Sequence, residues 1–346
     1  MSLPTFTFAS TADDVATALA AEIKGKNVLI TGTSLNGIGF ETARVLAKSA
    51  NLVIITGYNL ERLKLSEAAI KRDVPSANVR PLVLDLSFLA GVRKAAAEVN
   101  AYPEPLHVLI HNAAAPIASF KRTADGLETQ IATNHVGPFL LTKLLASKLL
   151  AARTARYTPR VVFVSSAAQG SVFGPPVDFT DIACADATAQ DGGTTYRLTK
   201  SANVAMAIAL STRSGGALNA YSLNPGAIYT NITQKAEARV ILQAAGVLKE
   251  DGMPNTERLR WKTIPQGAAT CHRCRGVRSP AEWHAPLDAP FSWLTSLDTA
   301  DKPGAYLNDS TVANEEVAAH CTDLANREKL WSITEEIIGE RFTFSL

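Results

Sequence analysis

Residues 28–39 read VLITGTSLNGIG and join an apolar, strand-like run to the start of a helical pattern. Gly32, Gly37 and Gly39 let the backbone turn sharply and approach a ligand closely, while the following helix offers free N–H groups and the positive end of its dipole. Such a turn suits a pyrophosphate. Because tight turns that bind nothing can look the same, its position in the first strand–helix unit carries this interpretation.

Outward from this turn, apolar runs alternate with helical patterns. Continuous apolar runs are typical of strands covered on both faces, and strand–helix alternation favours a doubly wound, Rossmann-like parallel α/β sheet with helices on both faces. We expect the strand order 3-2-1-4-5-6-7. The predicted strands are 28–31, 52–56, 79–84, 108–111, 161–164 and 220–223, and the helices between them include 38–50, 139–152 and 202–214.

Composition excludes several classes of partner. The 346 residues carry 34 basic and 32 acidic side chains, a net charge of +2 that gives no long-range field for nucleic acid. No apolar run reaches the length of a membrane span, and the start lacks a secretory signal pattern. Four scattered cysteines are too few for a disulfide framework, so we expect a cytoplasmic protein.

Two further motifs carry polar chemistry. The segment 196–200, YRLTK, places Tyr196 and Lys200 on one helix face, where the cation favours the phenolate and lowers the pKa of the tyrosine. The apolar run 160–164 ends in Ser165 and Ser166, at the sheet edge where ligands of such folds bind. Alone, the Tyr–Lys spacing is common on solvated helices, and capping of the next turn would explain one serine.

Taken in order, these motifs resemble the short-chain dehydrogenase/reductase family, and within it the retinol-dehydrogenase-like and fungal branch. The similarity covers roughly residues 24–235 and, more faintly, 266–270 and 304–331. It rests on the 31–39 turn and on the segments HNAA (111–114), TNHVGPF (133–139), SS (165–166), YRLTK (196–200) and PGAIYT (225–230).

The resemblance implies the site residues. In the family, the position of Tyr196 is the catalytic acid/base, Ser166 orients the substrate, Lys200 binds the nicotinamide ribose and tunes the tyrosine, and Asn134 holds a proton-relay water. Asp85 would contact adenine, Asn112 would steady the sheet beside the adenosine ribose, and the 225–230 turn would receive the nicotinamide amide. The implied cofactor-binding set is Gly32, Ser34, Leu35, Gly37, Ile38, Gly39, Asp85, Asn112, Lys143, Tyr196, Lys200, Ile228 and Thr230.

Two departures from the family pattern bear on the cofactor. The glycine turn is one residue longer through Leu35 and Asn36, so we expect a wider turn with binding intact. The second strand ends in ITGYN (55–59) without the acid that NAD-preferring enzymes use, and Arg62 and Lys64 follow closely. We therefore expect NADP(H) to be preferred over NAD(H).

The stretch 271–303 is irregular and departs from the family. Cys271 and Cys274 form a C-x-x-C, but only His272 and His284 lie near enough to complete a zinc site, so we predict no metal. A variable loop and a splicing or frame error in the gene are the two interpretations left open.

The resemblance also implies domains and activity. We expect an N-terminal helical arm over 1–26 with a helix from about 12 to 23, an NAD(P)-binding catalytic domain over 27–235, and a substrate-side segment of the same domain over 236–346. The implied reaction interconverts an alcohol and a ketone or aldehyde on an apolar small molecule, by analogy a fungal terpenoid or polyketide tailoring step; a homodimer is allowed. A cofactor-binding regulator without turnover, and an epimerase or dehydratase of the superfamily, stay open as alternatives.

Overall fold

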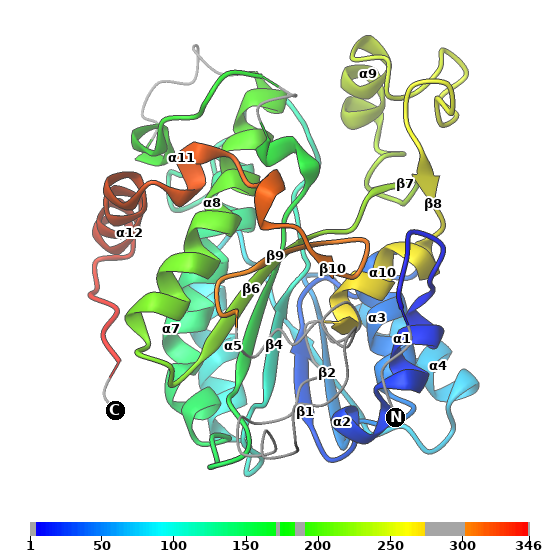
Figure 1. Cartoon of the computed structure of the whole chain (residues 1–346), viewed down its shortest axis with the longest axis vertical. Coiled ribbons are helices and arrows are strands. Elements are labelled where there is room, and N and C mark those ends of the chain that lie inside the picture. Colours follow the sequence, from blue (N-terminus) through cyan, green and yellow to red (C-terminus); the bar gives the residue numbers. More distant parts are fainter. Residues whose placement is uncertain (1–4, 171–173, 184–190, 274–301, 345–346) are drawn as a thin grey trace, which may run out of the picture.

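An eight-stranded sheet forms the centre of the computed structural model, which describes residues 5–170, 174–183, 191–273 and 302–344 (Figure 1). Its strand order is β10-β9-β6-β5-β4-β1-β2-β3, with every pair parallel except β9 and β10. The strands are β1 Asn27–Ile30, β2 Leu52–Gly57, β3 Val79–Val83, β4 Val108–His111, β5 Arg160–Val164, β6 Asn219–Asn224, β9 Tyr306–Asn308 and β10 Thr311–Val312.

The predicted doubly wound sheet and its order are therefore confirmed, with β9 in the seventh place. The antiparallel edge strand β10 was not predicted. Two short strands stand outside this sheet and pair with each other in parallel, β7 (Ala227–Ile228) and β8 (Trp261–Lys262).

Helices cover both faces of the sheet, and each face has its own apolar core. One face is covered by α1 (Ala12–Ala18), α3 (Ile38–Leu46), α4 (Leu60–Asp73) and α10 (Ile264–Arg273). The other is covered by α5 (Leu89–Ala101), α7 (Gly137–Leu150), α8 (Gly192–Arg213) and α12 (Leu324–Ile338). Shorter helical elements are α2 Ala20–Ile23, α6 Thr129–Ile131, the π-turn η1 Ala132–Val136, η2 Ala167–Gln169, η4 Phe179–Ala183, α9 Ala236–Ala244, η7 Asn314–Glu316 and α11 Ala319–Thr322.

The N-terminal arm contains two helices where one was expected, because the helix breaks at Leu19 between α1 and α2. Thr11 caps α1 through a capping box: its hydroxyl accepts from the Asp14 amide at 3.2 Å, and its own amide donates to the Asp14 carboxylate at 2.8 Å. Phe6 and Val15 are buried in the core beneath α3 and α10. The arm is thus part of the layer of helices that covers one face of the sheet.

The C-terminal segment takes several positions, although we expected it to fold over the substrate cleft. Among its described residues, the lobe with α9 projects beyond the sheet (Figure 1). Helix α10 covers the sheet beside α3, β9 extends the sheet, and α12 packs on the α7 side through Trp331 and Phe342, which contact Phe139. Their apolar side chains gain more burial there than at a solvated cleft. No helix in the described ranges is long and apolar enough to span a membrane.

Candidate active site

The glycine-rich turn follows β1 at the carboxyl edge of the sheet. Gly32 has φ +72, and a Cβ there would lie 2.7 Å from the Ala113 Cα atom, so only glycine fits. A Cβ on Gly39 would lie 2.4 Å from both the Asn112 Nδ2 atom and the Gly32 carbonyl oxygen. Helix α3 starts after Gly37, and no described side chain caps it. This bare helix N-terminus behind a turn in which Gly32 and Gly39 leave the backbone uncovered fits a pyrophosphate.

Asn112 joins the ends of β1 and β4 below this turn. Its Nδ2 donates to the Thr31 and Gly32 carbonyl oxygens, each at 2.9 Å, and its amide donates to the Thr31 hydroxyl at 3.0 Å. His111, which stands where the family has an asparagine, is buried, stacks on Phe163 and bonds Thr142 at 2.8 Å. Burial lowers the pKa of His111 to about 3, so this side chain is a neutral packing group.

The two serines at the end of β5 have different partners. Ser165 is buried and donates to the Lys200 carbonyl oxygen at 2.7 Å. Ser166 accepts from the Ala168 amide at 3.1 Å as the cap of η2, and its hydroxyl faces the Tyr196 phenol, whose pKa it lowers. Turn capping and contact with the tyrosine thus fall on the same residue, Ser166.

Tyr196 and Lys200 lie in the first turns of α8, whose start is capped by Asp191. The Lys200 Nζ atom lies 5.4 Å from the Tyr196 ring centroid and donates to the Val164 carbonyl oxygen at 2.8 Å. Burial lowers the pKa of Lys200 to about 8. Burial raises the pKa of Tyr196, and the Ser166 hydroxyl, which lowers this pKa, offsets the rise only in part.

The expected lowering of the tyrosine pKa by Lys200 is therefore wrong. The physical reason is that burial of the phenol raises its pKa, while the ammonium bonds a strand carbonyl.

Asn134 bridges two walls of the site from the π-turn η1. Its Oδ1 accepts from the Ala115 amide at 2.7 Å, and its Nδ2 donates to the Thr199 hydroxyl at 3.1 Å. The π-turn was not predicted, but Pro138 is its sequence signal, because proline has no N–H to donate back to the residue 134 carbonyl.

The turn after β6 brings its residues to the same edge. Gly226 has φ +92, and the buried Ile228 lies in β7. Asn224, which sequence reasoning missed, accepts from the Ala167 amide at 3.2 Å and from the Gly226 amide at 3.1 Å. It thereby ties the Ser166 turn to this one; an asparagine directly before Pro-Gly was the available signal. Thr230 follows, in a turn closed by Thr233.

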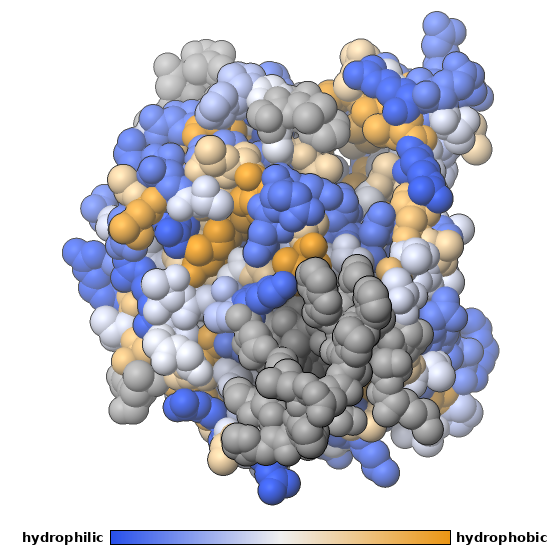
Figure 2. Space-filling model, viewed as in Figure 1, coloured by the Kyte–Doolittle hydropathy of each residue, from blue (hydrophilic) through white to orange (hydrophobic). Residues whose placement is uncertain are grey.

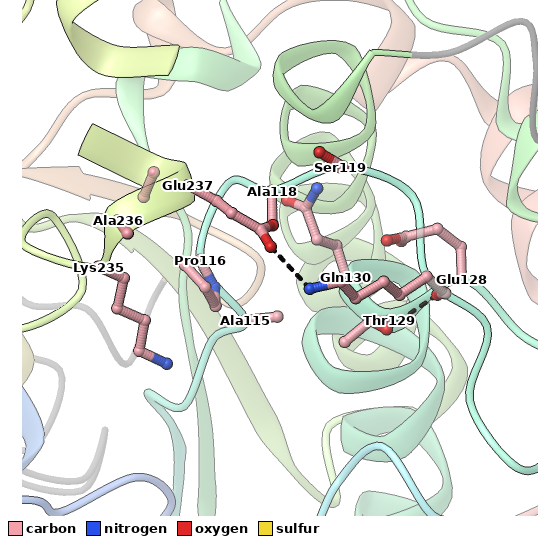
Figure 3. A pocket seen from close by; sticks show the side chains of 12 residues that line it. Ala115, Pro116, Ala118, Ser119, Glu128, Thr129, Gln130, Lys235, Ala236 and Glu237 are labelled. Carbon is pink, nitrogen blue, oxygen red and sulfur yellow. Dashed lines mark hydrogen bonds and ion pairs between the residues drawn. The ribbon is translucent and has the colours of Figure 1, made fainter. Parts of the chain in front are cut away.

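A pocket of about 350 Å³ lies beside this edge, between the loop after β4 and the start of α9 (Figure 3). Ala115, Pro116 and Ala236 give it apolar walls. Lys121 and Glu237 pair across it at 2.8 Å and link the loop to the lobe. Because Ala115 is also the partner of Asn134, the pocket adjoins Asn134.

The residues expected to contact adenosine lie at the ends of β2 and β3. Asp85 is exposed there, and its carboxylate accepts from the Ser87 amide at 2.9 Å. Tyr58 is 61% exposed. Lys64 pairs with Glu61 at 3.1 Å, whereas Arg62 is exposed and makes no ion pair within the described part of the chain.

Lys143 and the possible zinc ligands need separate comment. Lys143 lies in the middle of α7 and pairs with Glu340 at the end of α12, so the structure does not bring it to the other cofactor residues. Of the possible zinc ligands, Cys271 is a buried free thiol in α10, while Cys274 and His284 lie outside the described residues. The described ranges contain no group of histidine, cysteine and acidic residues that could hold a metal.

Comparison with known proteins gives a consistent result. The family model for short chain dehydrogenase matches residues 26–175. The chain is 32% identical to "Short-chain dehydrogenase TIC 32 A, chloroplastic" of Brassica napus, over 95% of this chain and 93% of that protein. It is 30% identical to "Short-chain dehydrogenase/reductase prx1" of Penicillium rubens (91% and 86% covered) and 28% identical to "Retinol dehydrogenase 12" of Homo sapiens (93% and 89%).

Solved structures share the fold. An uncharacterised protein from Mycobacterium paratuberculosis superposes with a TM-score of 0.63 at 23% identity, covering 94% of this chain and 98% of that one.

Proposed function

Because the chain belongs to the short-chain dehydrogenase/reductase family, with a retinol-dehydrogenase-like and fungal relationship, we propose that it interconverts an alcohol and a ketone or aldehyde on an apolar small molecule, using NADP(H) in preference to NAD(H). The observation that carries this proposal is the convergence of Ser166, Tyr196 and Lys200 beside the bare start of α3 at one sheet edge.

In this proposal each side chain has a defined step. When bound, the nicotinamide supplies or accepts the hydride. In reduction, Tyr196 donates its phenolic proton to the substrate oxygen, and Ser166 hydrogen-bonds that same oxygen. Lys200 binds the ribose and stabilises the phenolate; its ammonium has three N–H donors, so it can do this while one of them bonds the Val164 carbonyl oxygen. Asn134 holds the water through which Tyr196 regains its proton.

The cofactor preference rests on the end of β2. No acidic side chain occupies residues 55–60, so nothing there repels a 2′-phosphate. The Arg62 guanidinium, which has no ion-pair partner among the described residues, could bind one. Fluorescence titration with NADPH and, in parallel, NADH tests this directly. Saturable binding with lower Kd for NADPH is expected; equal affinities, or a preference for NADH, would refute the cofactor assignment.

The substrate class rests on the surroundings of the site. Most of the accessible surface that lines the pocket is apolar, although Lys121, Glu128, Lys235 and Glu237 also line it. The lobe with α9 exposes Val240 and Met253, and Figure 2 shows an apolar area over this lobe. We infer an apolar substrate, and by analogy with fungal relatives a terpenoid or polyketide tailoring step. A panel of apolar aldehydes and ketones, followed by loss of NADPH absorbance, tests this; turnover only of charged or sugar substrates would refute it.

We also propose a cytoplasmic enzyme, supported by the buried free thiols Cys271 and Cys321. Imaging of a fluorescent fusion tests this, and a plastid location, as in the name of the Brassica relative, would contradict it. Light scattering of the purified protein would show whether it forms the homodimer that the sequence allows.

A further inference from the structure

The lengthened glycine turn contacts the segment that follows β7. The Asn231 side-chain Nδ2 donates to the Leu35 carbonyl oxygen at 2.6 Å. Leu35 and Asn36 are the pair through which the turn exceeds the family length, and Asn36 adopts φ +58. A non-glycine residue in this left-handed region bends the chain sharply, directly after the carbonyl that Asn231 reaches.

Asn231 is held in place by the turn in which it lies, between Thr230 and Thr233. The Thr230 amide donates to the Thr233 hydroxyl at 3.2 Å, and that hydroxyl donates to the Thr230 carbonyl oxygen at 2.8 Å. The chain then continues into α9, where Ala238 is the buried residue. A helix so little buried adds few packing contacts of its own, so polar tethers decide where the lobe lies.

Two such polar contacts hold the lobe with α9 to two different segments. The Asn231–Leu35 bond holds the lobe to the glycine turn, and the Lys121–Glu237 ion pair at 2.8 Å holds it to the loop after β4. The first of these joins the turn assigned to the pyrophosphate to the turn assigned to the nicotinamide. A dinucleotide lying along both turns would pass this bond when it leaves.

We propose that Asn231 and the Leu35 carbonyl form a clasp that slows release of the bound cofactor, which makes Asn231 a positioning residue. The inference rests on the proposed function, because it takes the two turns as cofactor-binding. The clasp also gives the extra residue of the glycine turn a role, because the lengthened turn brings the Leu35 carbonyl oxygen to Asn231.

The test is the rate constant for NADPH dissociation, measured by stopped-flow displacement in the full chain. Asn231→Ala removes the donor and is expected to raise this rate constant about 3- to 10-fold, the range for one hydrogen bond. Asn231→Gln keeps an amide donor and should restore part of the slow release. The Kd of 2′,5′-ADP, which carries only the adenosine half, should change less than about two-fold.

Asn100→Ala is the matched control. Asn100 is also an exposed asparagine whose Nδ2 donates to a backbone carbonyl, that of Leu144 at 3.0 Å, but it joins α5 to α7 away from the cleft. Its NADPH release should equal that of the wild type.

Three outcomes would overturn the clasp. Unchanged release in Asn231→Ala refutes it while leaving the proposed function intact, and so does equal weakening of NADPH and 2′,5′-ADP, which indicates general damage to the fold. Wild-type protein that binds neither NADPH nor NADH refutes the proposed function, and the clasp with it.

Discussion

Replacing Gly39 with alanine tests whether the glycine turn is built as a closely packed cradle. The new Cβ would lie 2.4 Å from both the Asn112 Nδ2 atom and the Gly32 carbonyl oxygen. The second of these is backbone, so it cannot rotate away. The Asn112 amide must therefore move or the start of α3 must shift, and either movement breaks the bonds from Asn112 to Thr31 and Gly32.

The size of the effect follows from those bonds. Two hydrogen bonds contribute about 1 kcal/mol each, and a carbonyl left without a donor costs about 1 kcal/mol more. Alanine in a helix returns about 1 kcal/mol relative to glycine. We expect Gly39→Ala to lower the free energy of unfolding by about 2 kcal/mol, and the shifted turn to weaken NADPH binding by at least about ten-fold.

Urea denaturation measures the first quantity and fluorescence titration the second. Gly57→Ala is the matched control, because its Cβ would meet only the Leu63 Cδ1 atom, at the ordinary contact distance of 3.9 Å. The control should change the free energy of unfolding by less than about 1 kcal/mol. A Gly39→Ala protein with wild-type stability and wild-type NADPH affinity would refute the close-packed turn.

Three further predictions use single side chains. Arg62→Gln should raise the Kd for NADPH about ten-fold while the Kd for NADH stays constant. Lys64→Gln, which removes a cation paired with Glu61, should change neither Kd. Equal effects of Arg62→Gln on both cofactors would contradict the 2′-phosphate role. The pKa of Lys200 is lowered to about 8, so the positive charge that stabilises the Tyr196 phenolate is present below that pH and lost above it. The value of kcat/KM for reduction should therefore fall above about pH 8. A kcat/KM profile that stays flat to pH 10 would count against this role. Lys143→Met should leave NADPH affinity unchanged and cost about 0.5 to 1 kcal/mol of stability through the lost pairing with Glu340, whereas a ten-fold loss of affinity would restore Lys143 to the cofactor site.

Local patterns predicted the frame of the molecule well, because each carries its own physical signal. The run 28–31 corresponds to β1, and the run 108–111 coincides with β4. The glycine turn and the Tyr196–Lys200 spacing were equally readable, since steric freedom and helical periodicity act within a few residues.

Long-range contacts were not readable, because the partner of a side chain depends on the folded chain. The ion pair of Lys143 with Glu340 joins residues 197 positions apart. Helix α10 packs on α1, which lies far from it in the sequence. The bond from Lys200 to the Val164 carbonyl oxygen likewise arises only when α8 lies against β5. A resemblance transfers a residue's position, but the charge and burial around that position belong to this chain.

The central claim is that Tyr196 transfers the proton in a nicotinamide-dependent reduction. The direct measurement is the rate of NADPH oxidation with an apolar aldehyde for the wild type and Tyr196→Phe, alongside the Kd for NADPH of each. If Tyr196 transfers the proton, the variant has an unchanged Kd and a rate reduced by about 10² to 10⁴-fold. A Tyr196→Phe protein that oxidises NADPH at nearly the wild-type rate would contradict it.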